Sequence, residues 1–232
     1  MADITNSAPS FDACVFDAYG TLLDVASAAT KCSDTLGDKA APLGQLWRTK
    51  QLEYSWLRSL MGEHADFWQL TGDALDFAME TVGVDDSALR QRLMDLYFTL
   101  DAFPEVPGVL QVLKDRGIKT AILSNGSPDM LRGAIDHAGI APLLDAVYSV
   151  EDVGIFKPHP RVYQMAVDGL DLPPEKIRFL SSNAWDVAGA SYFGFRVIWV
   201  NRYGQAAERL PGGPEHVIRD LNGLVPLLGL EV

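Results

Sequence analysis

The chain has 232 residues, of which 48% are hydrophobic and 22% are charged, so it is long enough for a packed globular domain that carries an insert, and wholesale disorder is excluded. Its 31 acidic and 19 basic residues give a formal net charge of −12, and no basic run offsets that charge. Such a surface repels nucleic acid and anionic membranes, so we expect neither as a partner. No apolar run approaches the roughly 18 residues that a membrane span needs.

The first ten residues are polar and acidic, without the basic and then apolar order of a signal peptide, and we expect residues 1–10 to be a flexible tail. The two cysteines, Cys14 and Cys32, have no second cysteine or histidine at metal-binding spacing. In a chain without an export signal they indicate reduced thiols and a cytoplasmic location, while a disulfide between them stays open.

Short apolar runs, separated by helical stretches, predict the strands of one sheet. Most of them are continuously apolar rather than alternating, which is typical of strands buried on both faces of a parallel sheet. Ser127-Pro128-Asp129 predicts a helix start, and Gly139 predicts its end. We therefore predict an α/β fold with a Rossmann-like, doubly wound parallel sheet. The expected strands are 13–16, 120–123, 146–149, 177–180 and 196–200, with a short sixth at 217–218.

The alternation of strand and helix is interrupted by a long interval without a convincing strand. Its apolar residues recur at helical spacing instead, in two stripes. Pro104 and Pro107-Gly108 indicate a return to the first domain. We predict a helical cap subdomain over 25–104, inserted into a core domain of 11–24 and 105–232. The two stripes are Trp47, Tyr54, Leu57, Leu60 and Met61, followed by Leu89, Leu93, Leu96 and Leu100.

Polar and charged residues follow four of the predicted strands. Ligands of open parallel sheets bind outside the carboxyl ends of the strands, so these residues are expected to converge on one site. An anionic substrate of so acidic a protein needs a local cluster of cations. The four segments are Asp17, Ser124-Asn125-Gly126, Lys157-Pro158 and Ser181-Ser182-Asn183-Ala184-Trp185-Asp186.

These segments, in this order and spacing, resemble the haloacid dehalogenase superfamily from Phe11 to about Leu228, with the insert as the family's cap. The strings Phe16-Asp17-Ala18-Tyr19-Gly20-Thr21, Trp47-Arg48, Leu123-Ser124-Asn125-Gly126 and Ser181–Asp186 resemble the type II L-2-haloacid dehalogenases in particular. The resemblance implies a cofactor-free hydrolase that converts small anionic L-2-haloacids into D-2-hydroxyacids. Asp17 would displace the halide with inversion at C2, forming a covalent aspartyl ester that water hydrolyses.

The residue two positions after Asp17 separates this activity from its main alternative. The superfamily's phosphatases carry a second aspartate there as a general acid, whereas this chain has Tyr19, and a halide leaves without a proton. The phosphatases also hold Mg²⁺ with further carboxylates after the fourth strand, where Asp186 is the only acid. We therefore expect no metal site. A phosphatase and a dehalogenase acting on fluoroacetate-type substrates stay as alternatives.

The resemblance also implies a role for each candidate residue. Lys157 would keep Asp17 ionised and Thr21 would orient it, while Arg48 and Asn125 would receive the halide and Ser124 the substrate carboxylate. The hydrolytic water and Lys157 would be oriented by Ser181, Asn183 and Asp186, with Tyr163 in support. An apolar wall that excludes bulk water would be formed by Tyr19, Leu52, Phe67 and Trp185.

Each of these roles has a purely structural alternative. Asp17 suits a helix N-cap, as do Thr21, Asn183 and Asp186, and Ser124-Asn125-Gly126 suits a plain turn. Lys157 and Arg48 suit an exposed surface, and the aromatic residues, including Tyr163, suit ordinary core packing. Thr49 stands where family members often have glutamine. Asp24 is expected to cap or tether the chain, and no role is assigned to His64, His137, His159 and His216.

The resemblance further suggests a homodimer. The segment with Tyr54, Trp56, Leu57 and Leu60 carries more apolar surface than a single stripe needs, which favours a partner surface. The alternative is that all four side chains pack within the cap.

Overall fold

The computed structural model describes residues 11–25 and 31–229, so the predicted tail of residues 1–10 lies outside the described residues. Its centre is a six-stranded, wholly parallel sheet in the order β3-β2-β1-β4-β5-β6, which confirms the predicted α/β Rossmann-like class. The strands are β1 Ala13–Phe16, β2 Lys119–Ser124, β3 Ala146–Ser149, β4 Ile177–Ser181, β5 Arg196–Val200 and β6 His216–Ile218.

Strand β1 occupies the middle of the sheet and is buried along its whole length. It pairs with β2 through Phe16 and Ile122 and with β4 through Phe16 and Leu180. The strand order reverses between β1 and β4, and ligands of doubly wound sheets bind at such a switch point. The residue after β1, Asp17, therefore enters the crevice where this fold places ligands.

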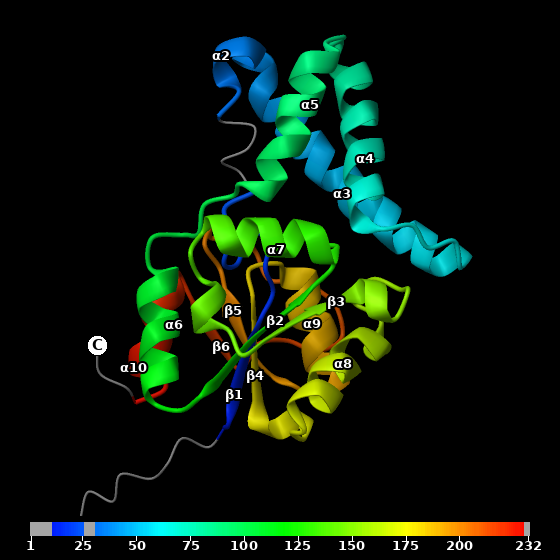
Figure 1. Cartoon of the computed structure of the whole chain (residues 1–232). Coiled ribbons are helices and arrows are strands. Elements are labelled where there is room, and N and C mark those ends of the chain that lie inside the picture. Colours follow the sequence, from blue (N-terminus) through cyan, green and yellow to red (C-terminus); the bar gives the residue numbers. More distant parts are fainter. Residues whose placement is uncertain (1–10, 26–30, 230–232) are drawn as a thin grey trace, which may run out of the picture.

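The helices of the core domain cover both faces of the sheet. In Figure 1, α6 and α10 lie on one side of the strands and α8 and α9 on the other. Helix α7 starts after Ser127, as predicted, although the Ser127 side chain makes no capping hydrogen bond, and Gly139 follows its end with a φ of 68°. The elements are α6 Val106–Asp115, α7 Pro128–His137, α8 Pro160–Leu170, α9 Ala184–Phe193, α10 Leu224–Leu227, and the 3-10 turns η3 Ala141–Leu143, η4 Val150–Asp152, η5 Pro174–Lys176 and η6 Leu221–Gly223.

Between β1 and α6 the described elements are all helical, and they stand above the carboxyl ends of the strands (Figure 1). The chain enters and leaves this unit side by side, since the Asp24 amide donates to the Asp101 carbonyl and the Phe103 amide to the Leu22 carbonyl. These bonds support the predicted limits of the cap, 25 and 104, which stay a prediction. The elements are α2 Ser33–Leu36, η1 Gly37–Lys39, α3 Ala40–Met61, α4 Phe67–Val82, α5 Ser87–Asp95 and η2 Leu96–Phe98.

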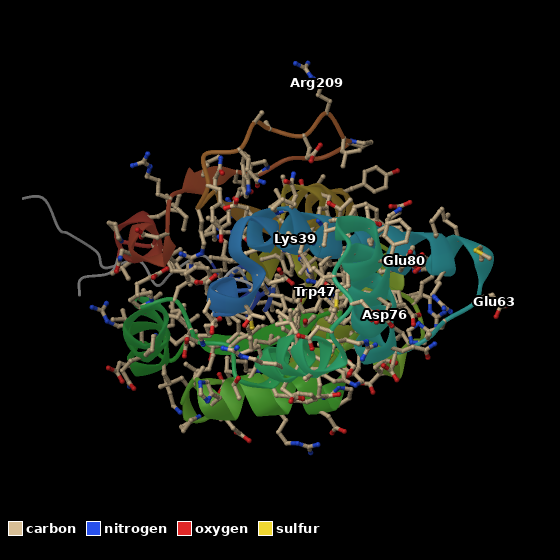
Figure 2. All side chains as sticks on the ribbon, turned by 90° about the horizontal axis from the view of Figure 1, so that it is seen from above. Lys39, Trp47, Glu63, Asp76, Glu80 and Arg209 are labelled. Atoms are coloured by element: carbon tan, nitrogen blue, oxygen red, sulfur yellow. The ribbon has the colours of Figure 1, made fainter. Side chains whose placement is uncertain are left out.

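The two apolar stripes of the cap differ in what they bury. Leu89, Leu93 and Leu100 of the second stripe are buried, as is Trp47 of the first, which lies near the centre of the view in Figure 2. The end of the first stripe departs from the pattern: Leu57, Leu60 and Met61 are 45%, 85% and 71% exposed. They occupy the last turns of α3, where the described chain covers about half of Leu57 and little of Leu60 and Met61.

The two cysteines, Cys14 and Cys32, are buried and not bonded to each other. Burial raises the pKa of the Cys14 thiol to about 12, so its reactive thiolate form is strongly disfavoured. Within 11–25 and 31–229, no helix combines the length and the apolar character that a membrane crossing requires.

We expect Gly189→Ala to destabilise the protein by about 1–3 kcal/mol through overpacking. A Cβ atom at this position of α9 would lie 2.5 Å from Pro158 Cβ and 2.6 Å from Tyr163 Oη. Urea unfolding measures the change, and Gly108→Ala in α6 is the control because its Cβ meets nothing within 4 Å. The control should be neutral or stabilising by up to about 1 kcal/mol. Equal unfolding free energies for the two variants would contradict the packing argument.

Candidate active site

Asp17 lies directly after β1, and its carboxylate accepts hydrogen bonds on both oxygens. Oδ1 accepts from Lys157 Nζ at 3.1 Å, and Oδ2 accepts from Asn183 Nδ2 at 2.8 Å and from Thr21 Oγ1 at 3.2 Å. Ser181 Oγ stands further away, 3.5 Å from Oδ2. The side chain is buried. Thr21 lies four residues after Asp17, and the other three donors come from segments distant in sequence. Donors on both oxygens fix the plane of the carboxylate.

Lys157 is fully buried and joins two carboxylates. Its Nζ lies 3.1 Å from Asp17 Oδ1 and 2.9 Å from Asp186 Oδ2, and Tyr163 Oη donates to Asp186 Oδ1 at 2.8 Å. Burial alone would lower the pKa of the Lys157 ammonium, but the charges of Asp17 and Asp186 outweigh it and raise the pKa above its usual value. Burial raises the pKa of the Asp186 carboxyl, against the attraction of Lys157. The ammonium therefore holds two otherwise repelling carboxylates together.

The same contact bears on the Mg²⁺ ion that the superfamily's phosphatases use. A hard divalent cation needs several oxygen ligands, and Asp17 and Asp186 would be the acidic ones here. Lys157 Nζ lies between these two carboxylates and would repel a second cation. Over the described ranges, no three His, Cys, Asp or Glu side chains are grouped as a metal site requires. The residues of this site do not fit Mg²⁺.

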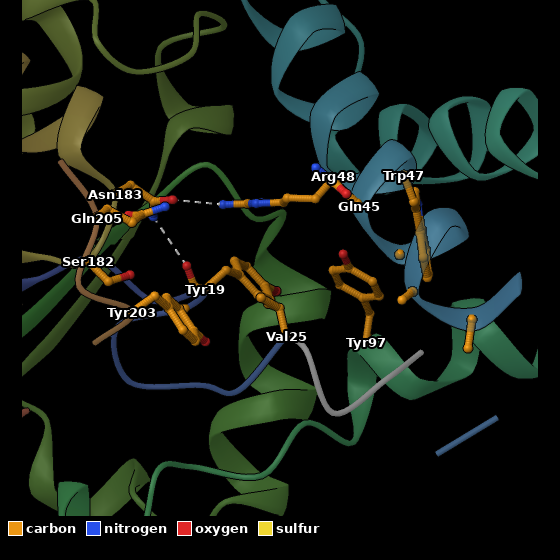
Figure 3. Close-up of a pocket in the computed structure, with 14 residues that line it drawn as sticks. Tyr19, Val25, Gln45, Trp47, Arg48, Tyr97, Ser182, Asn183, Tyr203 and Gln205 are labelled. Carbon is orange, nitrogen blue, oxygen red and sulfur yellow. Dashed lines mark hydrogen bonds between the residues drawn. The ribbon is translucent and has the colours of Figure 1, made fainter. Parts of the chain in front are cut away.

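Arg48 reaches from helix α3 of the cap toward the strand ends. Its Nη2 donates to Asn183 Oδ1 at 3.3 Å and its Nη1 to Gln51 Oε1 at 2.6 Å, and Figure 3 shows the guanidinium extended toward Asn183. Because Asn183 also donates to Asp17, one amide links the cap arginine to the carboxylate. Thr49 is exposed and its hydroxyl donates to the Gln45 carbonyl, so it takes no part in this contact.

The Ser124-Asn125-Gly126 segment forms a turn and also holds the site. Ser124 Oγ accepts from the Gly126 amide at 3.1 Å, while Asn125 Oδ1 accepts from the Lys157 amide at 3.0 Å. Neither side chain hydrogen-bonds to Asp17 itself. The structure thus brings this turn next to the lysine backbone, where Asn125 fixes the loop that carries the ammonium.

The aromatic residues of the predicted apolar wall fall into two groups. The ring centroid of Tyr19 lies 6.1 Å from that of Phe67 and 5.9 Å from that of Tyr97. Trp185 packs edge-to-face on Trp56 with centroids 5.4 Å apart. Leu52 is half-buried, one turn beyond Arg48 on α3. The Tyr19 hydroxyl is buried without a hydrogen-bond partner, and burial raises its pKa well above the usual value.

A cavity of about 790 Å³ opens beside Arg48 and Asn183, between the cap and the core (Figure 3). Asp17, Lys157 and Phe67 do not line it, whereas Asn183, which donates to Asp17, does. Its lining is mostly apolar or aromatic: Tyr19, Gly20, Val25, Ala40, Ala41, Gly44, Gln45, Trp47, Arg48, Tyr97, Ser182, Asn183, Tyr203 and Gln205.

Several residues around the site were not among the sequence-based candidates. Gln51 was predictable in principle, because it stands three residues after Arg48 on the same helix face. Thr71, Tyr97 and Tyr203 reach the site from elements distant in sequence, and no local pattern marks them. The histidines contact other groups: His64 pairs with Glu151, His137 lies near Asp101, His159 accepts from the Arg161 amide and His216 lies in β6.

Comparison with known proteins points to the family that the sequence resembles. A family model described as haloacid dehalogenase-like hydrolase matches residues 11–194. (S)-2-haloacid dehalogenase 1 of Pseudomonas sp. (strain CBS-3) is 49% identical over 217 residues, 93% of this chain and 96% of that protein. The structure of an L-2-haloacid dehalogenase from Xanthobacter autotrophicus with chloropropionic acid covalently bound superimposes with a TM-score of 0.88 at 37% identity, over 94% of this chain and 98% of that one. A crystal structure of a dehalogenase with an intermediate complex gives 0.94 at 46% identity, over 96% and 99%.

We expect Lys157→Met to destabilise the protein by about 3–5 kcal/mol at neutral pH, because it leaves two buried carboxylates without their cation. Without the attraction of Lys157, the pKa of Asp186 in the folded state rises further above its unfolded value. As the pH falls, the folded variant therefore binds a proton at a higher pH than the unfolded chain does. The loss of unfolding free energy relative to the wild type shrinks between about pH 7.5 and about pH 5.

Urea unfolding at both pH values measures this deficit. Lys176→Met is the control, since the Lys176 side chain is exposed and 3.7 Å from Asp12. The control should lose less than about 1 kcal/mol at either pH. A deficit of Lys157→Met that is the same at both pH values would contradict the proposed charge balance.

Proposed function

This chain belongs to the haloacid dehalogenase-like hydrolases, and we propose that it hydrolyses small L-2-haloacids to D-2-hydroxyacids. The observation that carries the proposal is the Asp17 carboxylate, buried, hydrogen-bonded on both oxygens and joined through Asn183 to the cap arginine. In this arrangement Asp17 is a fixed nucleophile, and Arg48 beside it is a cation that can bind an anion. The relatives named above carry the activity in their names, and one holds chloropropionic acid covalently.

The first step is an in-line displacement at C2. An oxygen of Asp17 attacks C2, a carbon–oxygen bond forms, and the carbon–halogen bond breaks with its electron pair leaving on the halide. The attack inverts C2. Arg48 and Asn125 face the departing anion in this scheme, and Arg48 supplies the positive charge that accepts it. Halide is a good leaving group, so the buried Tyr19 need not supply a proton.

The second step hydrolyses the aspartyl ester. Water attacks the side-chain carbonyl carbon of Asp17, the bond from that carbon to the ester oxygen breaks, and C2 keeps its configuration. Of the two protons of the water, one passes to the departing oxygen and forms the hydroxyl of the hydroxyacid, and the other goes to solvent as the Asp17 carboxylate is regenerated. Asn183 and Lys157 donate to the carboxyl oxygens of Asp17 and would stabilise the charge that develops there. We assign the placement of the water to the polar groups around Asp17, with Ser181 and Asn183 foremost. Asp186 and Tyr163 hold Lys157 in place.

Binding of the substrate is proposed to use the remaining candidates. Ser124 and the neighbouring backbone amides would bind the substrate carboxylate, while the wall of Tyr19, Leu52, Phe67 and Trp185 would exclude bulk water from the reacting oxygen. A phosphatase is the second candidate, because the fold is shared. Mg²⁺-dependent turnover of p-nitrophenyl phosphate without halide release from 2-chloropropionate would favour it.

We predict halide release from L-2-chloropropionate and not from the D enantiomer, measured beside chloroacetate and fluoroacetate. Under single-turnover conditions in H₂¹⁸O, the label should enter the Asp17 side chain, because water attacks the aspartyl carbonyl. Asp17→Asn should abolish nearly all turnover, since an amide is a poor nucleophile. Mass spectrometry of the enzyme and the product locates the label. Label confined to the hydroxyacid would mean that Asp17 acts as a general base, and the covalent scheme would be abandoned.

We also propose that the chain forms a homodimer through the end of α3, where Leu57, Leu60 and Met61 are exposed. Contiguous apolar surface of this kind marks interaction sites. A cytoplasmic location, expected from the two thiols, stays a proposal as well.

Leu60→Glu should shift the mass measured by light scattering at micromolar concentration from dimer toward monomer, because a charge would be buried in an apolar contact. Val217→Glu on strand β6 is the control, as this side chain is also exposed and belongs to the core domain. A wild-type mass of one chain would refute the dimer, and an equal shift in both variants would refute its placement on α3.

A further inference from the structure

A buried hydrogen-bond chain lies behind Arg48 inside the cap. Gln51 on α3 and Thr71 on α4 are both fully buried. Gln51 Oε1 accepts from Arg48 Nη1 at 2.6 Å, and Gln51 Nε2 donates to Thr71 Oγ1 at 2.7 Å and to Tyr97 Oη at 3.4 Å. The amide of Gln51 is buried, and its three hydrogen bonds all go to protein groups. These groups therefore determine which way its oxygen and nitrogen point.

The hydroxyl of Thr71 decides which way the amide of Gln51 faces. A hydroxyl has one proton, and Thr71 Oγ1 lies 2.6 Å from the Phe67 carbonyl, which can only accept. The proton is therefore directed to that carbonyl, and Thr71 can only accept from Gln51. The amide nitrogen then faces Thr71, and the amide oxygen faces the guanidinium. The hydrogen-bonding capacity of its partners thus fixes the orientation of the Gln51 amide.

Both ends of the Arg48 guanidinium rest on neutral amides. Nη1 binds the oxygen of Gln51 in the cap, and Nη2 binds the oxygen of Asn183 in the core. Among the described residues, no carboxylate forms an ion pair with Arg48. The side chain is thus oriented without being neutralised, and its full charge stays available to an incoming anion.

We infer that Gln51 is a positioning residue that aims the charge of Arg48 at the anion site and keeps it unpaired. The inference rests on the proposed function, in which Arg48 accepts the halide. It explains why an acceptor without charge stands at this buried position: a carboxylate there would form a short ion pair with Arg48 and compete with the halide. Thr71 contributes by holding the amide in the orientation that presents its oxygen.

A purely structural role for Gln51, that of joining α3 to α4, makes a different prediction. It would lower stability in a Gln51 variant without changing how the folded enzyme binds anions. Gln51→Met keeps the length of the side chain and removes the acceptor, whereas Gln51→Glu keeps an acceptor and adds a charge. Gln69→Glu is the charge control, because Gln69 is an exposed residue of the same helix as Thr71.

The experiment measures halide release from L-2-chloropropionate and the binding of bromide, followed by tryptophan fluorescence, in the full chain. Gln51→Met should lower kcat/KM about tenfold or more, the effect expected when a hydrogen bond to a charged group is lost. Gln51→Glu should lower it by a similar factor, because the added carboxylate pairs with Arg48 and competes with the halide. Gln51→Glu should also weaken bromide binding about tenfold, and Gln69→Glu less than about twofold. In an Arg48→Lys background, Gln51→Met should have less than about a twofold further effect, because the partner that it orients is gone.

Two outcomes would overturn the inference. One is a folded Gln51→Glu variant that binds bromide as the wild type does, and the other is an equal loss from Gln51→Met in the wild-type and Arg48→Lys backgrounds. A wild type that releases no halide would refute the proposed function instead, and the bromide titration would still decide the role of Gln51, because it needs no turnover.

Discussion

The buried ammonium of Lys157 between Asp17 and Asp186 is the interaction on which the rest of the site depends. Three titratable side chains are buried together, and the ammonium between the two carboxylates offsets the cost of burying them side by side. The groups come from the end of β1, the loop before α8 and the start of α9. Their meeting requires the parallel sheet with its reversal between β1 and β4, so the charge balance of the site and the topology of the fold constrain each other.

The core and the cap contribute different parts of the chemistry. In the proposed reaction, the core supplies the nucleophile Asp17, which has donors on both oxygens, and the cap supplies the cation Arg48, which has a neutral acceptor at both ends. Asn183 contacts both groups, since it donates to Asp17 and accepts from Arg48. The relative placement of nucleophile and cation therefore depends on how the cap sits on the core, and the backbone bonds at Asp24 and Phe103 limit that placement.

The sequence predicted the features that local patterns encode. Strands 13–16 and 196–200 have their predicted limits, because short, continuously apolar runs have few alternative structures. The convergence of Asp17, Lys157 and Asp186 followed from the rule on strand ends. Contacts between distant elements escaped prediction: nothing near Thr71 indicates that it orients Gln51. The 71% exposure of Met61 escaped as well, since helical periodicity does not show how far a helix extends beyond its packing partner.

The groups around Asp17 determine which leaving group can depart, and the leaving group determines which reaction the site supports. Asp17 could attack carbon or phosphorus, but an alcohol leaving group needs a proton from a nearby acid. The group two residues on is the phenol of Tyr19, and burial raises its pKa so far that it does not release a proton near neutrality. No acid is thus offered there, while Arg48 offers an unpaired positive charge. A leaving group that departs as a stable anion satisfies both conditions, and a halide is such a group.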